Sequence, residues 1–209
     1  MLERNTFVIK EQVKVLSSVQ TYDIFDAETG KAIGKAEETI GLFTKALRWV
    51  MSKHLLPTRL EVREKPDDSL VFVMRRGWYI FKSRVEVLDP DGELIGYFKS
   101  KVFTISGGFH VYDKNDKQFA EVKGKWVGFN YRFVTPDGKL EMGKVSKKLG
   151  ALGLVKEMFT SADTFAVEIA PEFSDEPMAK MLILAACLAI DMIYKSESRT
   201  VDTEDFLGD

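Results

Sequence analysis

The chain has 209 residues, 45% of them hydrophobic, which is enough to bury one core and does not require two domains. Its 30 Lys and Arg against 32 Asp and Glu leave a formal charge of -2, so no overall field favours nucleic acid or an anionic membrane. The only cysteine, Cys187, excludes an internal disulfide, and the N-terminus lacks a secretory signal, so we expect one cytoplasmic domain over residues 1–209.

A strand–turn–strand pattern occurs four times along the chain. Its copies read "YDIFDAETGKAIGKA", "VEVLDPDGELIGYFK", "FHVYDKNDKQFAEVK" and "YRFVTPDGKLEMGKV". Apolar and polar residues alternate in both arms, and Asp, Asn, Pro and Gly between the arms favour tight turns. Small residues recur just after the turns, where a bulge or a close strand approach favours a minimal side chain: Gly34, Gly96, Ala120 and Gly143.

Further strands bring the total close to that of a closed antiparallel barrel, which has no exposed edges. They are predicted at Phe7–Val15, Thr58–Glu64, Leu70–Arg75, Trp78–Ser83, Phe103–Ser106 and Phe165–Ile169.

The segment "GLFTKALRWVMSKHLL", from Gly41, is predicted to be an amphipathic helix. Phe43, Lys45, Arg48 and Trp49 are residue types that settle at a membrane interface, so they are candidates for lipid contact. The alternative is that the same helix packs over the mouth of the barrel.

Lysines recur on the strand arms and are the second set of candidates for contact with lipid headgroups. They are Lys99, Lys101, Lys123, Lys125, Lys144, Lys147 and Lys148. The alternative is an ordinary solvated exterior, because Glu121 and Glu141 interrupt the patch.

A second helix is predicted from about Glu176 to Lys195, with Pro177 in its first turn. Its uninterrupted apolar run between Lys180 and Asp191 has ten residues, about 15 Å, whereas a bilayer core is roughly 30 Å thick. A helix that is apolar on all sides is otherwise buried in protein, so we expect it in the core rather than in a membrane. Residues 196–209 form a polar, acidic tail.

The sequence carries no signature of catalysis, of a metal centre or of a cofactor. His54, His110 and Cys187 are too few and too scattered for such sites, and Cys187 stands in an apolar helix. We expect satisfied histidines, a core cysteine, no enzyme and no cofactor. A nucleic-acid reading module is also missing.

Three ordered C-terminal motifs carry a resemblance to a known family. They are "GKVSKK", then "EMFTSADTFAVEI", then "MAKMLILAACLAIDMIY". With these motifs and the hairpin "DPDGELIG", the chain resembles the phospholipid scramblase family from about Phe7 to Tyr194, and more distantly the LURP-one-related proteins that share its tubby-like fold. The resemblance implies a mainly β fold, a barrel of about twelve antiparallel strands around a C-terminal hydrophobic helix.

The resemblance is less informative about activity, because one fold hosts many functions. Members that move lipids carry a proline-rich region and a palmitoylated cysteine cluster, and neither is found in this sequence. We therefore expect a non-enzymatic, scramblase-like protein that associates peripherally with the inner face of a membrane or binds a lipid-like ligand. The alternative is a soluble signalling or interaction module that binds a protein partner and has no lipid role.

The resemblance also implies a calcium-binding stretch before the last helix, here Ser161 to Glu172. Only Asp163 and Glu172 retain carboxylates at the positions of that pattern, while Ser161 and Thr164 replace an expected aspartate and asparagine. Calcium needs several hard oxygen ligands at close spacing, so we expect no calcium site there.

Overall fold

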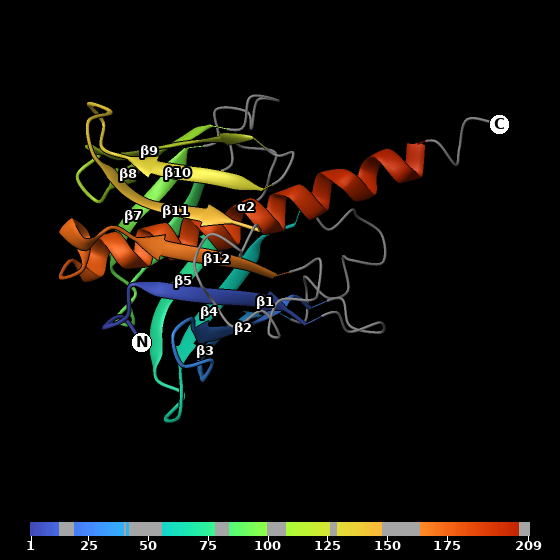
Figure 1. Ribbon diagram of the computed structural model, residues 1–209. Helices are drawn as coiled ribbons and strands as arrows, with labels where there is room; N and C mark the ends of the chain where they lie inside the picture. Colours follow the sequence, from blue (N-terminus) through green and yellow to red (C-terminus); the bar gives the residue numbers. More distant parts are fainter. Residues whose placement is uncertain are drawn as a thin grey trace.

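The computed structural model describes residues 1–12, 19–39, 41, 56–77, 84–99, 108–125, 129–147 and 164–204. These residues form a closed barrel of twelve antiparallel strands and one long C-terminal helix, which confirms the predicted fold class (Figure 1). The strands are β1 Thr6–Glu11, β2 Thr21–Asp26, β3 Ala32–Thr39, β4 Thr58–Glu64, β5 Leu70–Arg76, β6 Arg84–Leu88, β7 Leu94–Lys99, β8 Phe109–Asp113, β9 Gln118–Lys125, β10 Asn130–Val134, β11 Glu141–Ser146 and β12 Thr164–Ile169. A 3-10 turn, η4 Pro171–Phe173, precedes the helix α2 Pro177–Glu204.

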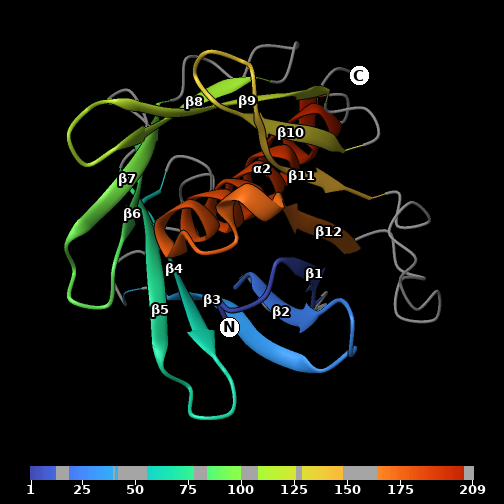
Figure 2. The same cartoon turned by 60° about the vertical axis from the view of Figure 1, so that its left-hand side comes forward.

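Each strand pairs with its neighbours in the sequence, and the ring closes where β1 pairs with β12. Residues 27–31, 65–69, 89–93, 114–117 and 135–140 join the strands in pairs at one end, called here the turn end. The helix α2 begins at the turn end, runs through the barrel and leaves at the opposite end, called here the exit end (Figures 1 and 2). All odd-numbered strands therefore finish at the exit end.

The core lies between the inner face of the barrel and α2. Alternate residues of the strands, such as Phe7 and Ile9 on β1, point inward and join a single apolar cluster with the helix. Residues 182–191 of α2 are all buried, including Cys187, which confirms that this helix is a core element. Three buried alanines in this part of the helix have small side chains, which allow the strands to approach it closely. They are Ala185, Ala186 and Ala189.

The predicted small residues after the turns coincide with close approaches and bulges. The register shifts beside Gly34, Gly96, Ala120 and Gly143. A Cβ at Gly143 would lie 2.6 Å from the carbonyl oxygen of Glu168 and 3.4 Å from Cδ1 of Ile183. Only glycine there lets β11 approach both β12 and the helix.

The predicted element boundaries match to different degrees. The strand Thr58–Glu64 matches residue for residue, and the one from Leu70 ends one residue later than predicted. The predicted strands Trp78–Ser83 and Phe103–Ser106 lie entirely outside the described ranges.

The predicted end of the last helix, at Lys195, is wrong, because α2 continues to Glu204. The apolar run stops before that point, but residues 196–204 contain no Gly or Pro that would break a helix. The helix therefore continues by local preference beyond the barrel, as Figure 1 shows.

Replacing Ala186 with Leu should overpack the barrel, because Ala186 is a fully buried residue of α2 inside the ring of strands. We expect the free energy of unfolding in urea to fall by about 1–3 kcal/mol. The control is Met178→Leu at the exposed start of the same helix, which should change stability little. Equal effects of the two changes would contradict close packing around Ala186.

Candidate functional site

The described candidate lysines lie on the second half of the barrel wall, and three of them lie at the exit end. Lys99 and Lys125 are the last residues of β7 and β9, and Lys147 follows the end of β11. Lys123 and Lys144 lie farther down the wall, where both pair in register with Arg132 of β10. The fold therefore brings together residues that are far apart in the sequence.

The charges of these lysines are compensated to different extents. Lys123 Nζ lies 3.1 Å from Oε2 of Glu121, and Lys144 Nζ lies 2.9 Å from Oε2 of Glu168. Lys99 and Lys147 instead contact aromatic rings, and no carboxylate of the described residues forms an ion pair with either. Lys147 Nζ lies 5.1 Å from the ring centre of Phe129.

Several predicted site residues lie outside the described part of the chain. They are Phe43, Lys45, Arg48, Trp49, Lys101, Lys148 and Asp163, and His54 lies there too. For Lys125 only the backbone is described. The strands β3 and β4, which flank residues 42–55, both have their adjoining ends at the exit end.

A cluster of aromatic and basic side chains on the outer surface of β6–β8 was not predicted. Tyr97 and Tyr112 stack with ring centres 5.2 Å apart and planes 10° from parallel. Lys99 Nζ lies 4.5 Å from the ring centre of Tyr112, and the Arg84 guanidinium carbon lies 3.8 Å from that of Tyr97. The sequence signal was present in β7, where Tyr97 and Lys99 are two residues apart and so share the outer face.

The ionisable residues that bracket the apolar run of α2 are both buried in the barrel. At the turn end, Lys180 Nζ donates a hydrogen bond of 2.7 Å to the carbonyl oxygen of Leu2. At the exit end, the Tyr22 hydroxyl donates to Asp191 Oδ2 at 3.0 Å. Burial lowers the pKa of Lys180, while burial and the nearby Asp191 carboxylate raise the pKa of Tyr22 well above its usual value.

Cys187, the only cysteine of the sequence, is not a reactive thiol. Burial in the helix, reinforced by Asp191, raises the pKa of Cys187 well above its usual value. The thiol therefore stays protonated at neutral pH, and a protonated thiol is a poor nucleophile and a poor metal ligand.

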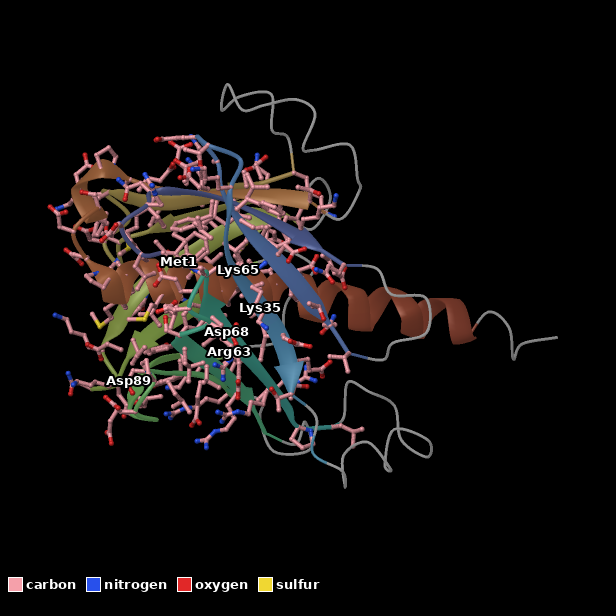
Figure 3. All side chains as sticks on the ribbon, turned by 90° about the horizontal axis from the view of Figure 1, so that it is seen from below. Met1, Lys35, Arg63, Lys65, Asp68 and Asp89 are labelled. Atoms are coloured by element: carbon pink, nitrogen blue, oxygen red, sulfur yellow. The ribbon has the colours of Figure 1, made fainter. Side chains whose placement is uncertain are left out.

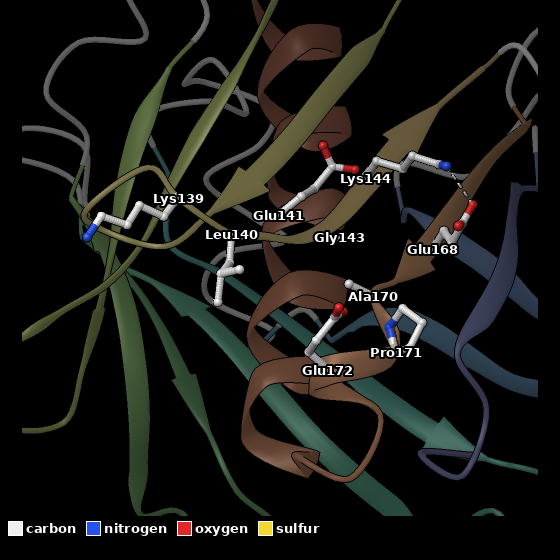
Figure 4. Close-up of a pocket in the computed structure, with 9 residues that line it drawn as sticks. All are labelled: Lys139, Leu140, Glu141, Gly143, Lys144, Glu168, Ala170, Pro171 and Glu172. Atoms are coloured by element: carbon white, nitrogen blue, oxygen red, sulfur yellow. Dashed lines mark ion pairs between the residues drawn. The ribbon is translucent and has the colours of Figure 1, made fainter.

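A surface pocket of about 320 Å³ lies beside Lys144, near the turn end (Figure 4). It is lined by Lys139, Leu140, Glu141, Gly143, Lys144, Glu168, Ala170, Pro171 and Glu172. Glu172 is therefore the one calcium candidate that the structure describes. The two amines and the Lys144–Glu168 ion pair reduce the negative charge available to a divalent cation.

Two wider searches of the described residues bear on function. No group of three or more His, Cys, Asp or Glu side chains in this part of the chain could hold a metal ion. In the same residues, no helix has the length and the hydropathy needed to cross a membrane.

Comparison with known proteins gives a consistent set of matches. The family described as Scramblase matches residues 21–197. Phospholipid scramblase family member 5 of Homo sapiens is 23% identical over 124 residues, which cover 56% of this chain and 44% of that protein. Phospholipid scramblase 2 of Bos taurus is 26% identical over 121 residues, 55% of this chain and 40% of that protein. The chain thus aligns with less than half of each relative, and no solved structure matches it.

Replacing Tyr22 with Phe should destabilise the protein, because it removes a buried hydrogen bond to a carboxylate that stays in the core. We expect a loss of about 1–3 kcal/mol in urea unfolding at neutral pH. Above pH 10, the usual pKa of tyrosine, the unfolded chain loses the Tyr22 proton while the folded chain keeps it. The wild type should therefore lose stability there, and its advantage over Tyr22→Phe should shrink.

Tyr112→Phe is the matched control, since it removes a hydroxyl from the outer surface and keeps the stacked ring. Two results would contradict the Tyr22–Asp191 hydrogen bond as a stabilising contact. One is an equal loss of unfolding free energy in Tyr112→Phe and Tyr22→Phe. The other is a stability difference between the wild type and Tyr22→Phe that stays the same above pH 10.

Calcium titration by calorimetry should show no saturable binding in the micromolar range. The two candidate carboxylates, Asp163 and Glu172, are too few for a hard cation that takes six to eight oxygen ligands. A saturable signal that disappears in Asp163→Ala or Glu172→Gln would restore a calcium site.

Proposed function

The chain belongs to the scramblase family, and on that premise we propose that it is a non-enzymatic, lipid-interacting protein that binds a membrane surface through the exit end of its barrel. The relatives named above are phospholipid scramblases by name, which supports a lipid as the partner. Because they are matched over less than half of their length, lipid movement between leaflets is not part of this proposal.

The observation that carries the proposal is that basic residues from three strands reach the exit end. Lys99, Lys125 and Lys147 come from three different strands or their ends. Lys99 and Lys147 rest against aromatic rings and form no ion pair with a carboxylate of the described residues, which supports their availability to anionic headgroups. Basic and aromatic side chains together are typical of protein surfaces at the lipid–water boundary.

The amphipathic segment that contains Phe43 and Trp49 adds to this proposal. It connects β3 to β4, and the adjoining ends of both strands belong to the exit end. Apolar side chains from this segment would supply the burial in the headgroup region that lysines alone do not supply.

The opposite part of the barrel wall differs in its charge pattern. On β3–β5, cations meet carboxylates: Lys35 Nζ lies 3.3 Å from Asp68 Oδ1, and Arg63 Nη2 lies 2.8 Å from Glu61 Oε2. Figure 3 shows Lys35, Arg63 and Asp68 near one another on this wall. Charges neutralised in this way favour contact with water over contact with an anionic membrane.

The inner leaflet of a cell membrane is the anionic one, and each lysine held near it contributes about 1 kcal/mol. We therefore assign the protein to the cytoplasm and to the inner face of the membrane. The protonated, buried Cys187 supports a non-enzymatic role.

Vesicle co-sedimentation tests this function directly. The protein should bind phosphatidylcholine vesicles that contain phosphatidylserine, should bind pure phosphatidylcholine weakly, and should be released by salt. The pair of changes Lys99→Gln and Lys147→Gln should weaken binding roughly 30-fold, from about 1 kcal/mol for each lysine.

The matched control makes the same chemical change at the turn end, with Lys117→Gln and Lys139→Gln, two exposed lysines. Equal weakening in both pairs would refute the exit end as the membrane face. No binding by the unmodified protein would refute the lipid role and favour the soluble interaction module.

A further inference from the structure

Three basic side chains form a row across the outer surface of β6, β7 and β8. Arg84 pairs in register with Lys99, and Lys99 pairs in register with His110. Side chains directly opposite on neighbouring strands have Cβ atoms about 4.5–5.5 Å apart. The row therefore places three nitrogen-bearing side chains on one patch near the exit end.

The stacked tyrosines beneath this row position the two cations. Tyr97 is 1% exposed although it points outward, because the neighbouring side chains cover it. It contacts the Arg84 guanidinium on one side and Tyr112 on the other, and its hydroxyl donates to Asp116 Oδ1 at 2.6 Å. Lys99 Nζ lies 5.6 Å from the ring centre of Tyr97 and 4.5 Å from that of Tyr112. Both cations thus rest on the same pair of rings.

Two carboxylates, Glu86 and Asp116, lie against this patch, and three cations, Arg75, Arg84 and Lys99, outnumber them. Glu86 is shared between two arginines, with Arg75 Nη2 at 2.7 Å and Arg84 Nε at 3.3 Å. Glu121, the register partner of His110, forms its ion pair with Lys123. Within the described residues, Lys99 has no carboxylate partner.

His110 adds an unused hydrogen-bonding atom to the patch. Its Nδ1 is buried and has no hydrogen-bond partner among the described residues. A ligand that reached this nitrogen would supply a hydrogen bond that the described residues do not supply.

We propose that Arg84, Lys99 and His110 form a binding site for a phosphate group on the outer surface of β6–β8. A phosphate offers three or more acceptor oxygens, enough for donors from three adjacent strands, whereas a carboxylate offers two. The site goes beyond the proposed function, because it names a ligand group and does not depend on vesicle binding. A soluble phosphate ester and a lipid headgroup present the same group.

The first experiment uses glycerol 3-phosphate, a soluble phosphate monoester, and follows the backbone amides of residues 97–99 and 110–112 by NMR. We expect saturable shifts at these amides and none with acetate at equal ionic strength. Lys99→Gln should weaken binding about tenfold, since one charge-assisted hydrogen bond is lost. Lys147→Gln, the same change at the same end but outside the site, should have little effect.

The second experiment distinguishes the two sources of phosphate. If the ligand is a lipid headgroup, the protein should bind vesicles with phosphatidic acid more tightly than vesicles with phosphatidylserine at equal surface charge, and Lys99→Gln should remove this preference. If Lys99→Gln weakens the binding of glycerol 3-phosphate but does not change the preference between vesicles, the ligand is a soluble phosphate compound.

The site would be overturned by the absence of both responses. The site would also be overturned if Lys99→Gln and Lys147→Gln weakened binding equally in both experiments. Phosphate binding would then depend on the net positive charge of the exit end and not on this site. Failure of phosphatidylserine vesicles to bind would refute the membrane proposal and leave the soluble experiment unaffected.

Discussion

The filling of the barrel by α2 is the constraint on which the rest of the structure depends. A closed barrel of about eight strands can be filled by its own side chains, and twelve strands enclose a wider space. Here a helix that is buried on all sides from residue 182 to residue 191 occupies that space. Its alanines and the glycines of the strands allow close packing. The polar contacts of Lys180 and Asp191 lie at the two ends of this buried part of the helix.

This filled interior directs function to the outside of the molecule. Burial and the nearby Asp191 carboxylate keep Cys187 and Tyr22, inside the barrel, in their neutral forms. The exterior wall is divided by charge: β3–β5 carry compensated ion pairs, while the exit end carries lysines beside aromatic rings. Membrane contact and phosphate binding both use this second region, and neither requires the core to open.

Much of the fold could be predicted because the signals are local. Period-two alternation, turn residues and the small residue after each turn all lie within about fifteen residues of one another, and they specified the hairpins together with their bulges. The end of α2 could not be predicted from the apolar run, because the helix continues to Glu204, well beyond the end of that run. The Tyr22–Asp191 hydrogen bond, which joins residues 169 apart, needs the register of the whole barrel. The same holds for the Arg84–Lys99–His110 row, since its members belong to three strands and only pairing makes them neighbours.

The closure of the ring between β1 and β12 has a consequence for how the chain folds during synthesis. The first strand must wait for a partner that begins at Thr164, and the helix that fills the interior follows that partner. Until both have left the ribosome, the inward apolar faces of eleven strands lack their core. Such non-local pairing slows folding and leaves apolar surfaces and unpaired strand edges exposed to other chains. The inner face of the barrel therefore stays open to non-native contacts until residues 164–191 have been made.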